Sequence, residues 1–382
     1  MKRRDFLKRT ATGVAAAGLV AGRLAGLVGA APVLPKRKLG NTGWEATVHG
    51  FGTMNIPDDG YEAIMDRLME LGVNYVDTAY GYEGGNCERK LGTIVPKYRD
   101  RIFLATKWPH GGPPESFVAS LDESLRRMKV DSVDLIQTHM CKNADMINDE
   151  RVLEGFGRVK QAGKARFLGF TSHENIVDTC NAGIANGNYA CMLIKNGPLA
   201  NQQFNLDPVI KKAHDAGMGV IAMKCQEGDR DFPGSEKFRA GGVSLYAARV
   251  KWVLSNPNIT TLITNCVSLA VAEENTKAAM QEMTEAEEQA IREYLALAKP
   301  YVCTGCGQCT RLCPRGVKVA DILRYEAYAT GHRQPAQGRE LYAKLPRGQT
   351  FAACNLCGIC EGACPNGLRV MDRLKDAHRV LA

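Results

Sequence analysis

The sequence has no uninterrupted apolar run of about 18 residues, the length that a membrane-spanning helix needs, so we expect no span in the mature chain. It also lacks the low hydrophobic content of a disordered chain. Of its 382 residues, 45% are hydrophobic and 24% are charged, which is ordinary for a globular protein. At roughly 150 residues per domain, this length predicts two or three domains, or one barrel with an appendage.

Most of the chain also lacks a strong basic excess. The formal net charge is +8, but residues 1–31 hold six Lys and Arg side chains against one Asp, which leaves only +3 for the remainder. A nucleic-acid interface would need a larger, clustered excess. We therefore expect no nucleic-acid partner.

The basic N-terminus has the parts of a targeting peptide. Lys2-Arg3-Arg4-Asp5-Phe6-Leu7-Lys8 precedes an Ala/Gly-rich run from Ala11 to Ala31, and the small residues around Gly29 suit cleavage after Ala30. The basic start resembles the twin-arginine export signal, which a receptor recognises as an address. A basic amphipathic helix and a retained signal anchor are the alternatives. The resemblance implies export of a folded protein by the twin-arginine translocation machinery, to the periplasm or an equivalent compartment.

Eight of the fourteen cysteines form two runs in about the last 80 residues. Each run has the spacing Cys-x2-Cys-x2-Cys-x3-Cys-Pro of bacterial ferredoxins, in which the fourth cysteine binds the cluster of the other run. We therefore predict two [4Fe–4S] clusters. The predicted ligands are Cys303, Cys306, Cys309 and Cys364 for one cluster, and Cys354, Cys357, Cys360 and Cys313 for the other.

Structural zinc and disulfides are the alternatives for these cysteines. Zinc ribbons use pairs of cysteines rather than runs of four, and neither alternative explains the proline after each run. Gly305, Gly307 and Gly358 are expected at positive φ, where a tight turn aims N–H groups at a cluster. The spacer holds two helical segments, Val317–Ala329 and Gly338–Leu345, so residues 299–382 are predicted to be a mainly helical, ferredoxin-like domain.

The other six cysteines are expected to be buried thiols. Four of them, Cys87, Cys141, Cys225 and Cys266, fall near the predicted catalytic face, where a further redox or metal site is the alternative.

Between the two ends of the chain, β-rich runs alternate with amphipathic helical segments. Eight strand–helix pairs over about 250 residues predict a (β/α)8 TIM barrel, which we place at residues 36–298. A doubly wound open sheet is the alternative, but no Gly-x-Gly-x-x-Gly follows the first strand. The predicted strands are Thr47–Gly52, Val73–Thr78, Ile102–Lys107, Asp134–His139, Ala165–Thr171, Met192–Asn196, Gly219–Lys224 and Thr261–Asn265, and the helices include Tyr61–Leu71, Ser116–Met128, Asp149–Gln161, Asp207–Ala216, Val243–Ser255 and Glu285–Lys299.

Polar side chains stand where these strands end, which is where a barrel of this type places its chemistry. Asp77, Lys107 and His139 lie at the ends of the second, third and fourth predicted strands, and Tyr82 follows the second. Trp108 and His110, just past Lys107, either line the substrate pocket or pack in the loop.

Around these residues the chain resembles the aldo-keto reductases. The resemblance covers about residues 36–290 and implies an oxidoreductase that interconverts a carbonyl and an alcohol. It is carried by Lys36-Arg37-Lys38-Leu39-Gly40-Asn41-Thr42-Gly43, Asn74-Tyr75-Val76-Asp77-Thr78-Ala79-Tyr80-Gly81-Tyr82, Glu88-Arg89-Lys90-Leu91-Gly92 and Ala105-Thr106-Lys107.

The resemblance implies a catalytic tetrad of Asp77, Tyr82, Lys107 and His139. A carbonyl that becomes an alcohol needs a proton, and a free tyrosine with a pKa of about 10 is a poor donor at neutral pH. We expect Lys107, paired with Asp77, to lower the pKa of Tyr82. His139 is expected to orient the carbonyl and to contact its oxygen.

The resemblance also implies NAD(P)H as a cofactor, held by Ser172, His173, Asn196, Glu274 and Asn275. The second half of the chain departs from the family pattern. The sixth strand lacks the usual glutamine and the aromatic that stacks on the nicotinamide ring. No Lys or Arg for the 2′-phosphate stands in residues 265–268.

Together these features predict an exported iron–sulfur oxidoreductase that exchanges electrons with a redox partner protein through two clusters. A cluster transfers one electron at a time and a hydride carries two, so this hypothesis needs a two-electron relay: a nicotinamide, a flavin or the substrate itself. One alternative is an electron-transfer or binding subunit whose barrel is a non-catalytic scaffold. Another is an ordinary NADPH-dependent reductase whose clusters are structural.

Overall fold

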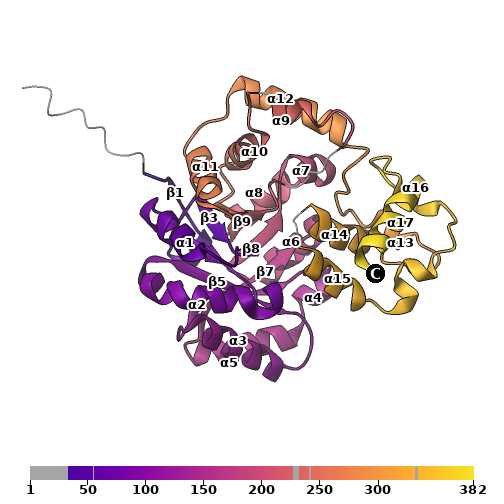
Figure 1. Ribbon diagram of the computed structural model, residues 1–382. Helices are drawn as coiled ribbons and strands as arrows, with labels where there is room; N and C mark the ends of the chain where they lie inside the picture. The colour runs from indigo at the N-terminus through magenta and orange to yellow at the C-terminus, as the bar shows by residue number, and fades with distance from the viewer. Residues whose placement is uncertain (1–32, 55, 227–231, 241, 332–333) are drawn as a thin grey trace, which may run out of the picture. The chain divides into compact units, whose positions relative to one another are not determined.

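A computed structural model describes residues 33–54, 56–226, 232–240, 242–331 and 334–382. Residues Leu34–Ala382 form one compact unit (Figure 1). The predicted export signal lies outside the described residues. Within the described ranges, no helix is long and apolar enough to cross a bilayer.

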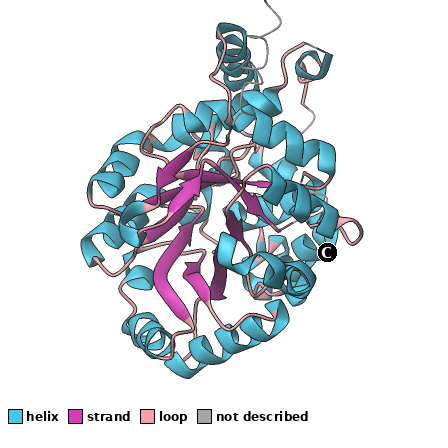
Figure 2. Ribbon diagram, turned by 90° about the vertical axis from the view of Figure 1, so that its left-hand side faces the viewer, coloured by secondary structure: helices cyan, strands magenta, loops and turns pink. Residues whose placement is uncertain are grey.

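Eight parallel strands close into a barrel in the order β10-β3-β4-β5-β6-β7-β8-β9, with helices around them (Figure 2). The predicted (β/α)8 barrel is confirmed, and each predicted strand corresponds to one strand of the barrel. The strands are β3 (His49–Gly52), β4 (Tyr75–Asp77), β5 (Phe103–Pro109), β6 (Val133–His139), β7 (Ala165–Ser172), β8 (Cys191–Lys195), β9 (Gly219–Met223) and β10 (Thr261–Asn265).

The helices of the barrel bury one apolar face each. In α3, Phe117, Leu121, Leu125 and Met128 recur at helical spacing and are buried, so this face packs against the strands. The longer helices are α1 (Tyr61–Glu70), α2 (Asn86–Tyr98), α3 (Pro114–Met128), α5 (Glu150–Gln161), α6 (Ile176–Asn186), α8 (Asp207–Asp215), α10 (Leu245–Leu254), α11 (Leu269–Ala279) and α12 (Glu285–Ala298), and the shorter ones are α4 (Ala144–Ile147), α7 (Pro198–Phe204) and α9 (Lys237–Ala240).

A β-hairpin closes the N-terminal end of the barrel. Its strands β1 (Lys36–Lys38) and β2 (Glu45–Thr47) pair antiparallel. The loop between them packs on the start of β9, where Asn41 N donates to Gly217 O at 2.8 Å. Leu39 and Ala46 join the core inside the barrel, beside Tyr75 and Phe103. The C-terminal end of the barrel is therefore the end at which a site can form.

The residues after the barrel form a small helical module, as predicted. We call residues 299–382 the C-terminal module. It has a core of its own, which includes Ile322, Leu323 and Leu374. Its helices are α13 (Gln308–Arg311), α14 (Val319–Thr330), α15 (Pro335–Ala343), α16 (Ile359–Gly362) and α17 (Val370–Leu381).

Polar contacts join the module to the loops at the C-terminal end of the barrel. Gln334 Nε2 donates to Met54 O at 2.5 Å, next to β3. Lys142 Nζ, in the loop after β6, lies 3.2 Å from Asp321 Oδ1 of α14. These contacts place α14 over the end of the barrel at which the site is expected.

Candidate active site

The four predicted tetrad residues lie on neighbouring elements. Asp77 ends β4, His139 ends β6, and Tyr82 begins a short 3-10 turn after β4. Lys107 lies two residues before the end of β5, because the pairing with β6 continues through Pro109, opposite His139. Consecutive parallel strands thus bring all four side chains to one end of the barrel.

Asp77 and Lys107 form a buried ion pair that has further partners. Lys107 Nζ donates to a carboxylate oxygen of Asp77 and, at 2.6 Å, to Thr78 O. The other Asp77 oxygen accepts from Gln137 Nε2 at 2.8 Å. Burial raises the pKa of Asp77 and lowers the pKa of Lys107, and their mutual attraction opposes both shifts. The extra hydrogen bonds satisfy the two buried charges, as such a pair requires.

Tyr82 lies against this pair and beside His139. Lys107 Nζ is 4.7 Å from the centroid of the Tyr82 ring, and the Tyr82 and His139 rings meet edge-on at 5.9 Å. Burial raises the pKa of Tyr82 well above its usual range, and the charge of Asp77 adds to the effect. The net rise is thus set by burial and by Asp77, and the expected lowering of this pKa by the Lys107 ammonium stays a prediction.

The imidazole of His139 is held in its neutral form. Burial lowers the pKa of His139 well below its usual range, and the positive charges of Lys107, Arg324 and Lys224 lower it further. A neutral imidazole has one N–H donor and one acceptor nitrogen. It is therefore able to donate a hydrogen bond to a carbonyl oxygen without adding a positive charge.

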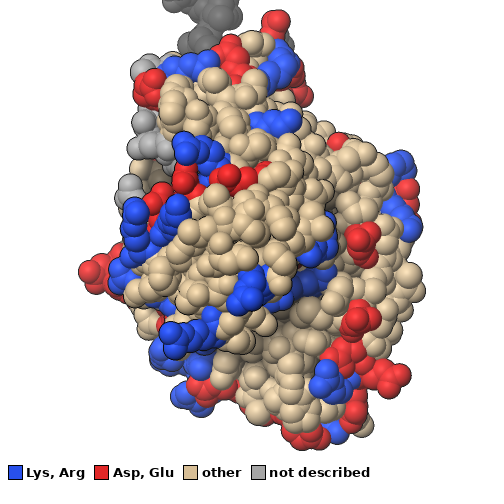
Figure 3. Space-filling model, turned by 90° about the vertical axis from the view of Figure 1, so that its right-hand side faces the viewer, with Lys and Arg blue, Asp and Glu red and all other residues tan. Residues whose placement is uncertain are grey.

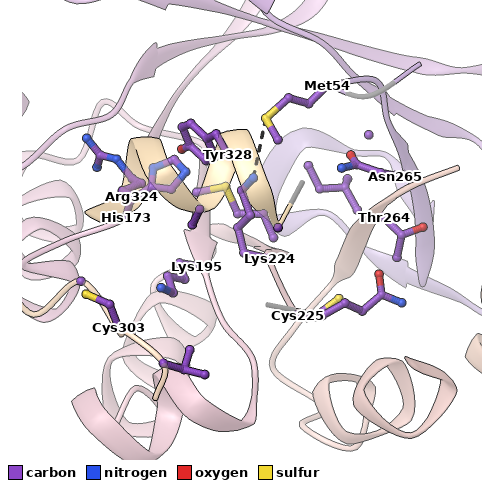
Figure 4. A pocket seen from close by; sticks show the side chains of 18 of the residues that line it. Met54, His173, Lys195, Lys224, Cys225, Thr264, Asn265, Cys303, Arg324 and Tyr328 are labelled. Carbon is purple, nitrogen blue, oxygen red and sulfur yellow. Dashed lines mark hydrogen bonds between the residues drawn. The ribbon is translucent and has the colours of Figure 1, made fainter. Parts of the chain in front are cut away.

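A cavity of about 530 Å³ opens beside the tetrad, between the barrel and the C-terminal module. We call it the barrel cavity. Asp77 and Tyr82 line it from the barrel. Arg324 and Tyr328 line it from α14, and Cys303 lines it from the start of the module (Figure 4). Its volume is in the range of small-molecule sites. The cavity thus joins the predicted catalytic tyrosine and a predicted cluster ligand.

The five residues expected to hold a nicotinamide nucleotide are not brought together around the cavity. His173 and Glu274 line it, whereas Ser172, Asn196 and Asn275 are buried behind its wall. Hydrogen bonds already engage three of the five. Ser172 Oγ donates to Glu174 O at 3.0 Å, Glu274 accepts from Ser244 Oγ at 2.9 Å, and Asn275 Nδ2 donates to Thr264 Oγ1 at 3.0 Å.

The cavity wall does not fit a 2′-phosphate. On the side of β10 and α11, where the family resemblance places that group, no described lining residue is basic, and Glu274 contributes a carboxylate. A carboxylate repels a phosphate at short range. We therefore assign no step of the reaction to NADPH.

Neither Trp108, which lies in β5, nor His110, which follows this strand, lines the barrel cavity. Trp108 is buried, with its ring centroid 4.9 Å from that of Phe117. His110 Nε2 lies 3.1 Å from Asp149 Oδ2. Packing in the loop is thus supported for His110, whereas Trp108 packs from the strand against α3.

Four cationic side chains of the cavity were not predicted as site residues. Lys195 ends β8, Lys224 follows β9, and Arg324 comes from α14 (Figure 4). The fourth, Arg373, comes from α17. Lys195 Nζ donates to Thr304 O at 3.0 Å, between Cys303 and Gly305. The position of Lys195 and Lys224 at strand ends was the available signal. Nothing in the local sequence indicates that α14 lies over the end of the barrel.

The eight cysteines of the ferredoxin runs surround two separate small cavities. Cys303, Cys306, Cys309 and Cys364 line one, and we call them the first cysteine group. Cys313, Cys354, Cys357 and Cys360 line the other, and we call them the second cysteine group. These are the two sets that the spacing predicts, with the fourth cysteine of each run exchanged. That the groups hold clusters remains a prediction.

The backbone around the groups fits iron–sulfur clusters. The predicted positive φ is confirmed at Gly305, Gly307 and Gly358, with values of 78°, 74° and 78°. Leu356 N donates to Cys354 Sγ and Leu368 N to Cys364 Sγ, each at 3.4 Å. Such N–H donors stabilise the negative charge of cluster thiolates. No three His, Cys, Asp or Glu side chains in the described ranges are placed to hold a single metal ion.

All fourteen cysteines are free thiols in this structure, and the six outside the runs are buried, as expected. Burial raises the pKa of Cys141 to about 12 and that of Cys266 to about 11. These two thiols therefore stay protonated at neutral pH. Cys225 lines the barrel cavity.

Two family models match the chain. Residues 48–228 match the aldo/keto reductase family, and residues 302–371 match a 4Fe-4S dicluster domain.

Curated relatives match parts of the barrel. An uncharacterized oxidoreductase of Bacillus subtilis is 34% identical over 150 residues, which are 36% of this chain and 48% of that protein. L-glyceraldehyde 3-phosphate reductase of Escherichia coli is 31% identical over 141 residues, which are 33% of this chain and 40% of that enzyme. The chain thus spans about half, or less, of the length of these relatives.

A solved structure shares the barrel. The holo form of the aldo-keto reductase AKR11C1 from Bacillus halodurans has a TM-score of 0.59 and is 24% identical. The match covers 71% of this chain and 98% of that structure. At this identity the likeness shows the fold.

Proposed function

We propose that the protein is an exported oxidoreductase that interconverts a carbonyl and an alcohol, on the premise that residues 48–228 match the aldo/keto reductase family and residues 302–371 match a 4Fe-4S dicluster domain. Its electrons pass through two [4Fe–4S] clusters, one in each cysteine group. The observation that carries the proposal is the barrel cavity, because Tyr82 and Cys303 both line it.

In the proposed reaction, the substrate lies in the barrel cavity with its carbonyl oxygen toward Tyr82 and His139. Reduction takes two electrons, which the clusters would supply one at a time, and two protons, one for the carbonyl oxygen and one, from solvent, that forms the new C–H bond at the carbonyl carbon; solvent also returns a proton to Tyr82 afterwards. The Tyr82 hydroxyl gives one proton to the oxygen, which becomes more basic than the phenolate as electrons reach the carbonyl carbon. Lys107, held by Asp77, lies over the ring that becomes negative, and the neutral His139 donates a hydrogen bond to the same oxygen.

The cysteine groups provide the electron route. Clusters bound there supply single electrons, and the first group is the one that adjoins the barrel cavity through Cys303. No cysteine of the second group lines the barrel cavity, and Cys357 of this group is exposed to solvent. Electrons would therefore move between a partner at the surface, the second group, the first group and the cavity.

Replacement of Tyr82 tests the barrel chemistry. The probes are DL-glyceraldehyde and methylglyoxal, chosen because relatives of the barrel are named as reductases of such compounds. Each is added under anaerobic conditions to the dithionite-reduced full-length protein, and cluster reoxidation is followed by absorbance. We expect Tyr82→Phe to slow the reaction at least roughly 100-fold, and Tyr80→Phe, two residues away, to react like the wild type.

The same measurement distinguishes the scaffold alternative. If Tyr82→Phe reoxidises as fast as the wild type while its cluster spectrum is intact, the barrel is a non-catalytic scaffold in an electron-transfer subunit. The clusters are tested separately by iron and acid-labile sulfide, for which we expect about eight of each per chain. Four or fewer in fully loaded protein would contradict the ligand assignment.

Cofactor release identifies the relay. Anaerobic purification followed by acid release should show whether a nicotinamide or a flavin accompanies the clusters. We expect no binding of NADPH at millimolar concentration, because none of the described residues on the wall formed by β10 and α11 is basic. Tight NADPH binding would instead support an ordinary reductase whose clusters are structural.

Export by the twin-arginine route is proposed from residues 1–31. It is consistent with a cluster protein, because clusters are assembled in the cytoplasm and the route carries folded proteins. Replacement of both Arg3 and Arg4 by Lys should retain the full-length precursor inside the cell, whereas Lys8→Arg should leave export unchanged. Export of the double variant at the wild-type rate would contradict this assignment.

A further inference from the structure

The second cysteine group reaches the surface beside exposed apolar side chains. Cys357 is exposed, and Cys313 and Cys354 are half-buried. Seven large hydrophobic side chains are exposed in the described ranges, and three of them flank this group. They are Leu312, Leu356 and Ile359, with exposed fractions of 58%, 50% and 46%.

Each of these three residues is adjacent in the chain to a cysteine of the second group, and we call the three side chains together the apolar patch. Leu312 follows α13 and precedes Cys313, and Ile359 begins α16 between Cys357 and Cys360. The helices α13 and α16 contact each other. Leu356 directly precedes Cys357. Contiguous apolar surface that is exposed on a soluble protein often marks a site of interaction with another protein.

The surroundings of the patch are basic. Residues 299–382 hold 13 Lys and Arg against 6 Asp and Glu, a net charge of +7, whereas residues 32–298 hold 30 against 34, a net charge of −4. The net charge of +3 for residues 32–382 is thus the sum of a strongly basic module and an acidic barrel. Figure 3 shows the face over the module, on which Lys and Arg side chains lie around uncharged surface.

Two arginines bring this charge next to the second cysteine group. Arg311 and Arg315 are exposed and flank Leu312 in the chain, and Arg315 also lines the cavity of the group together with Ile359. Among the described residues, no carboxylate lies within ion-pair distance of either guanidinium. Their nearby acceptors are uncharged: Arg315 Nε donates to Ala353 O at 3.4 Å, and Arg311 donates to Asn175 Oδ1 at 3.3 Å.

We propose that the apolar patch and its arginines form the docking site for an acidic one-electron carrier protein, which exchanges electrons with the cluster of the second cysteine group. An apolar centre with a charged rim has the composition of a transient protein interface, and the basic rim selects an acidic partner and accelerates its approach. A second copy of this chain is a poor occupant in a symmetric dimer, because the patch would then face another patch and bring a module of +7 against the first.

The inference rests on the clusters of the proposed function and is independent of the barrel chemistry. In the exchange, one electron leaves the reduced cluster and reduces one centre in the carrier, and no bond forms or breaks. If the clusters are present and Tyr82→Phe has no effect on a carbonyl, the docking site still stands. If the docking test fails, the barrel chemistry is untouched.

Stopped-flow electron transfer tests the site with two probes of opposite charge. The full-length protein is reduced with dithionite, desalted anaerobically and mixed with oxidised rubredoxin, which is acidic, or with oxidised cytochrome c, which is basic. We expect the second-order rate constant for rubredoxin to fall as salt is added and that for cytochrome c to rise. At low salt, Arg315→Glu should slow rubredoxin reduction roughly tenfold and accelerate cytochrome c reduction.

Matched variants control for net charge and for folding. Arg339→Glu removes the same charge from an exposed arginine of α15 that also donates from Nε to a backbone carbonyl, and it should react like the wild type. Leu356→Asn removes apolar surface and suits the φ of 60° at this residue. It should slow rubredoxin severalfold with its cluster spectrum intact, whereas Leu269→Asn, a matched exposed position on α11, should not.

Two results would overturn the proposal. The first is an Arg315→Glu variant that reduces rubredoxin at the wild-type rate with the wild-type salt dependence. The second is a wild-type dimer, measured by sedimentation, that Leu356→Asn converts to a monomer, because the patch would then be covered by a second copy.

Discussion

Lys195 is the residue that connects the barrel wall to the first cysteine group. It is buried at the end of β8, and its ammonium donates to the carbonyl of Thr304, next to Cys303. Burial raises the pKa of Cys303 to about 11, and the charge of Lys195 opposes that rise. A positive charge at this position favours the more negative, reduced state of a cluster in the first group.

We therefore expect Lys195→Met to shift the midpoint potential of one cluster to a more negative value, measured by redox titration with detection by electron paramagnetic resonance. Lys195→Arg keeps the positive charge and should leave the midpoint potential close to that of the wild type. Lys142→Met removes a lysine that contacts α14 through Asp321 and serves as the control. Equal shifts of both clusters in Lys195→Met would argue against a local effect.

His49 couples stability to pH. It is fully buried in β3, its ring nitrogens contact Thr276 Oγ1 at 3.0 Å and Thr264 Oγ1 at 2.8 Å, and burial lowers its pKa to about 4. The unfolded chain, with a histidine pKa of about 6.5, binds this proton at a higher pH than the folded protein. The free energy of unfolding is therefore expected to fall as pH decreases from about 6.5 toward 4.

The expected contribution of His49 is up to about 1.4 kcal/mol per pH unit in that window. His49→Gln should lower stability at neutral pH and reduce the slope below pH 6.5, measured from urea unfolding midpoints. His214→Gln, at an exposed position of α8, should keep the wild-type slope. An unchanged slope in His49→Gln would mean that this histidine does not titrate on unfolding.

At the scale of elements, α14 determines the size of the barrel cavity. Ala327 faces the cavity from this helix, beside Tyr328 and Leu323. Ala327→Phe should fill part of the space that the substrate uses and raise its KM at least roughly tenfold, with cluster absorbance unchanged. Ala336→Phe, at an exposed position of α15, is the control. If KM did not change in Ala327→Phe, the substrate would have to bind outside the barrel cavity.

The strand ends were predictable because they depend on local sequence. A buried apolar run followed by Asp77 or His139 places the polar side chain at the end of a strand. The grouping of the cysteines was predictable for a similar reason, since the short spacers leave few ways to arrange the ligands.

Contacts between distant segments were not predictable. Lys195 and Thr304 are 109 residues apart, and no pattern in either segment indicates their contact. The net rise in the pKa of Tyr82 was not predictable either, because it comes mainly from burial, which depends on the surrounding structure. The basic module was missed because an acidic barrel nearly cancels its charge in the total.

At the scale of the whole molecule, the barrel and the module have separate cores. The core of the module includes Cys309 and Cys360, one from each cysteine group. Loss of both clusters should therefore unfold the module and leave the barrel folded. Calorimetry after treatment with ferricyanide and EDTA should show the loss of one transition and the retention of the barrel transition, whereas EDTA alone should change neither. Loss of both transitions together would mean that the barrel depends on the module.

The exchange of the fourth cysteine between the two groups has a topological consequence. Cys313 and Cys364 each reach into the group of the other run, so neither run completes a group alone. Between the runs, Arg347 is exposed in a short turn and offers trypsin a cleavage site. With the two proposed clusters bound, a chain cut there would be two separate pieces of polypeptide, each of which supplies ligands to both clusters. They should travel as one particle until the iron is removed.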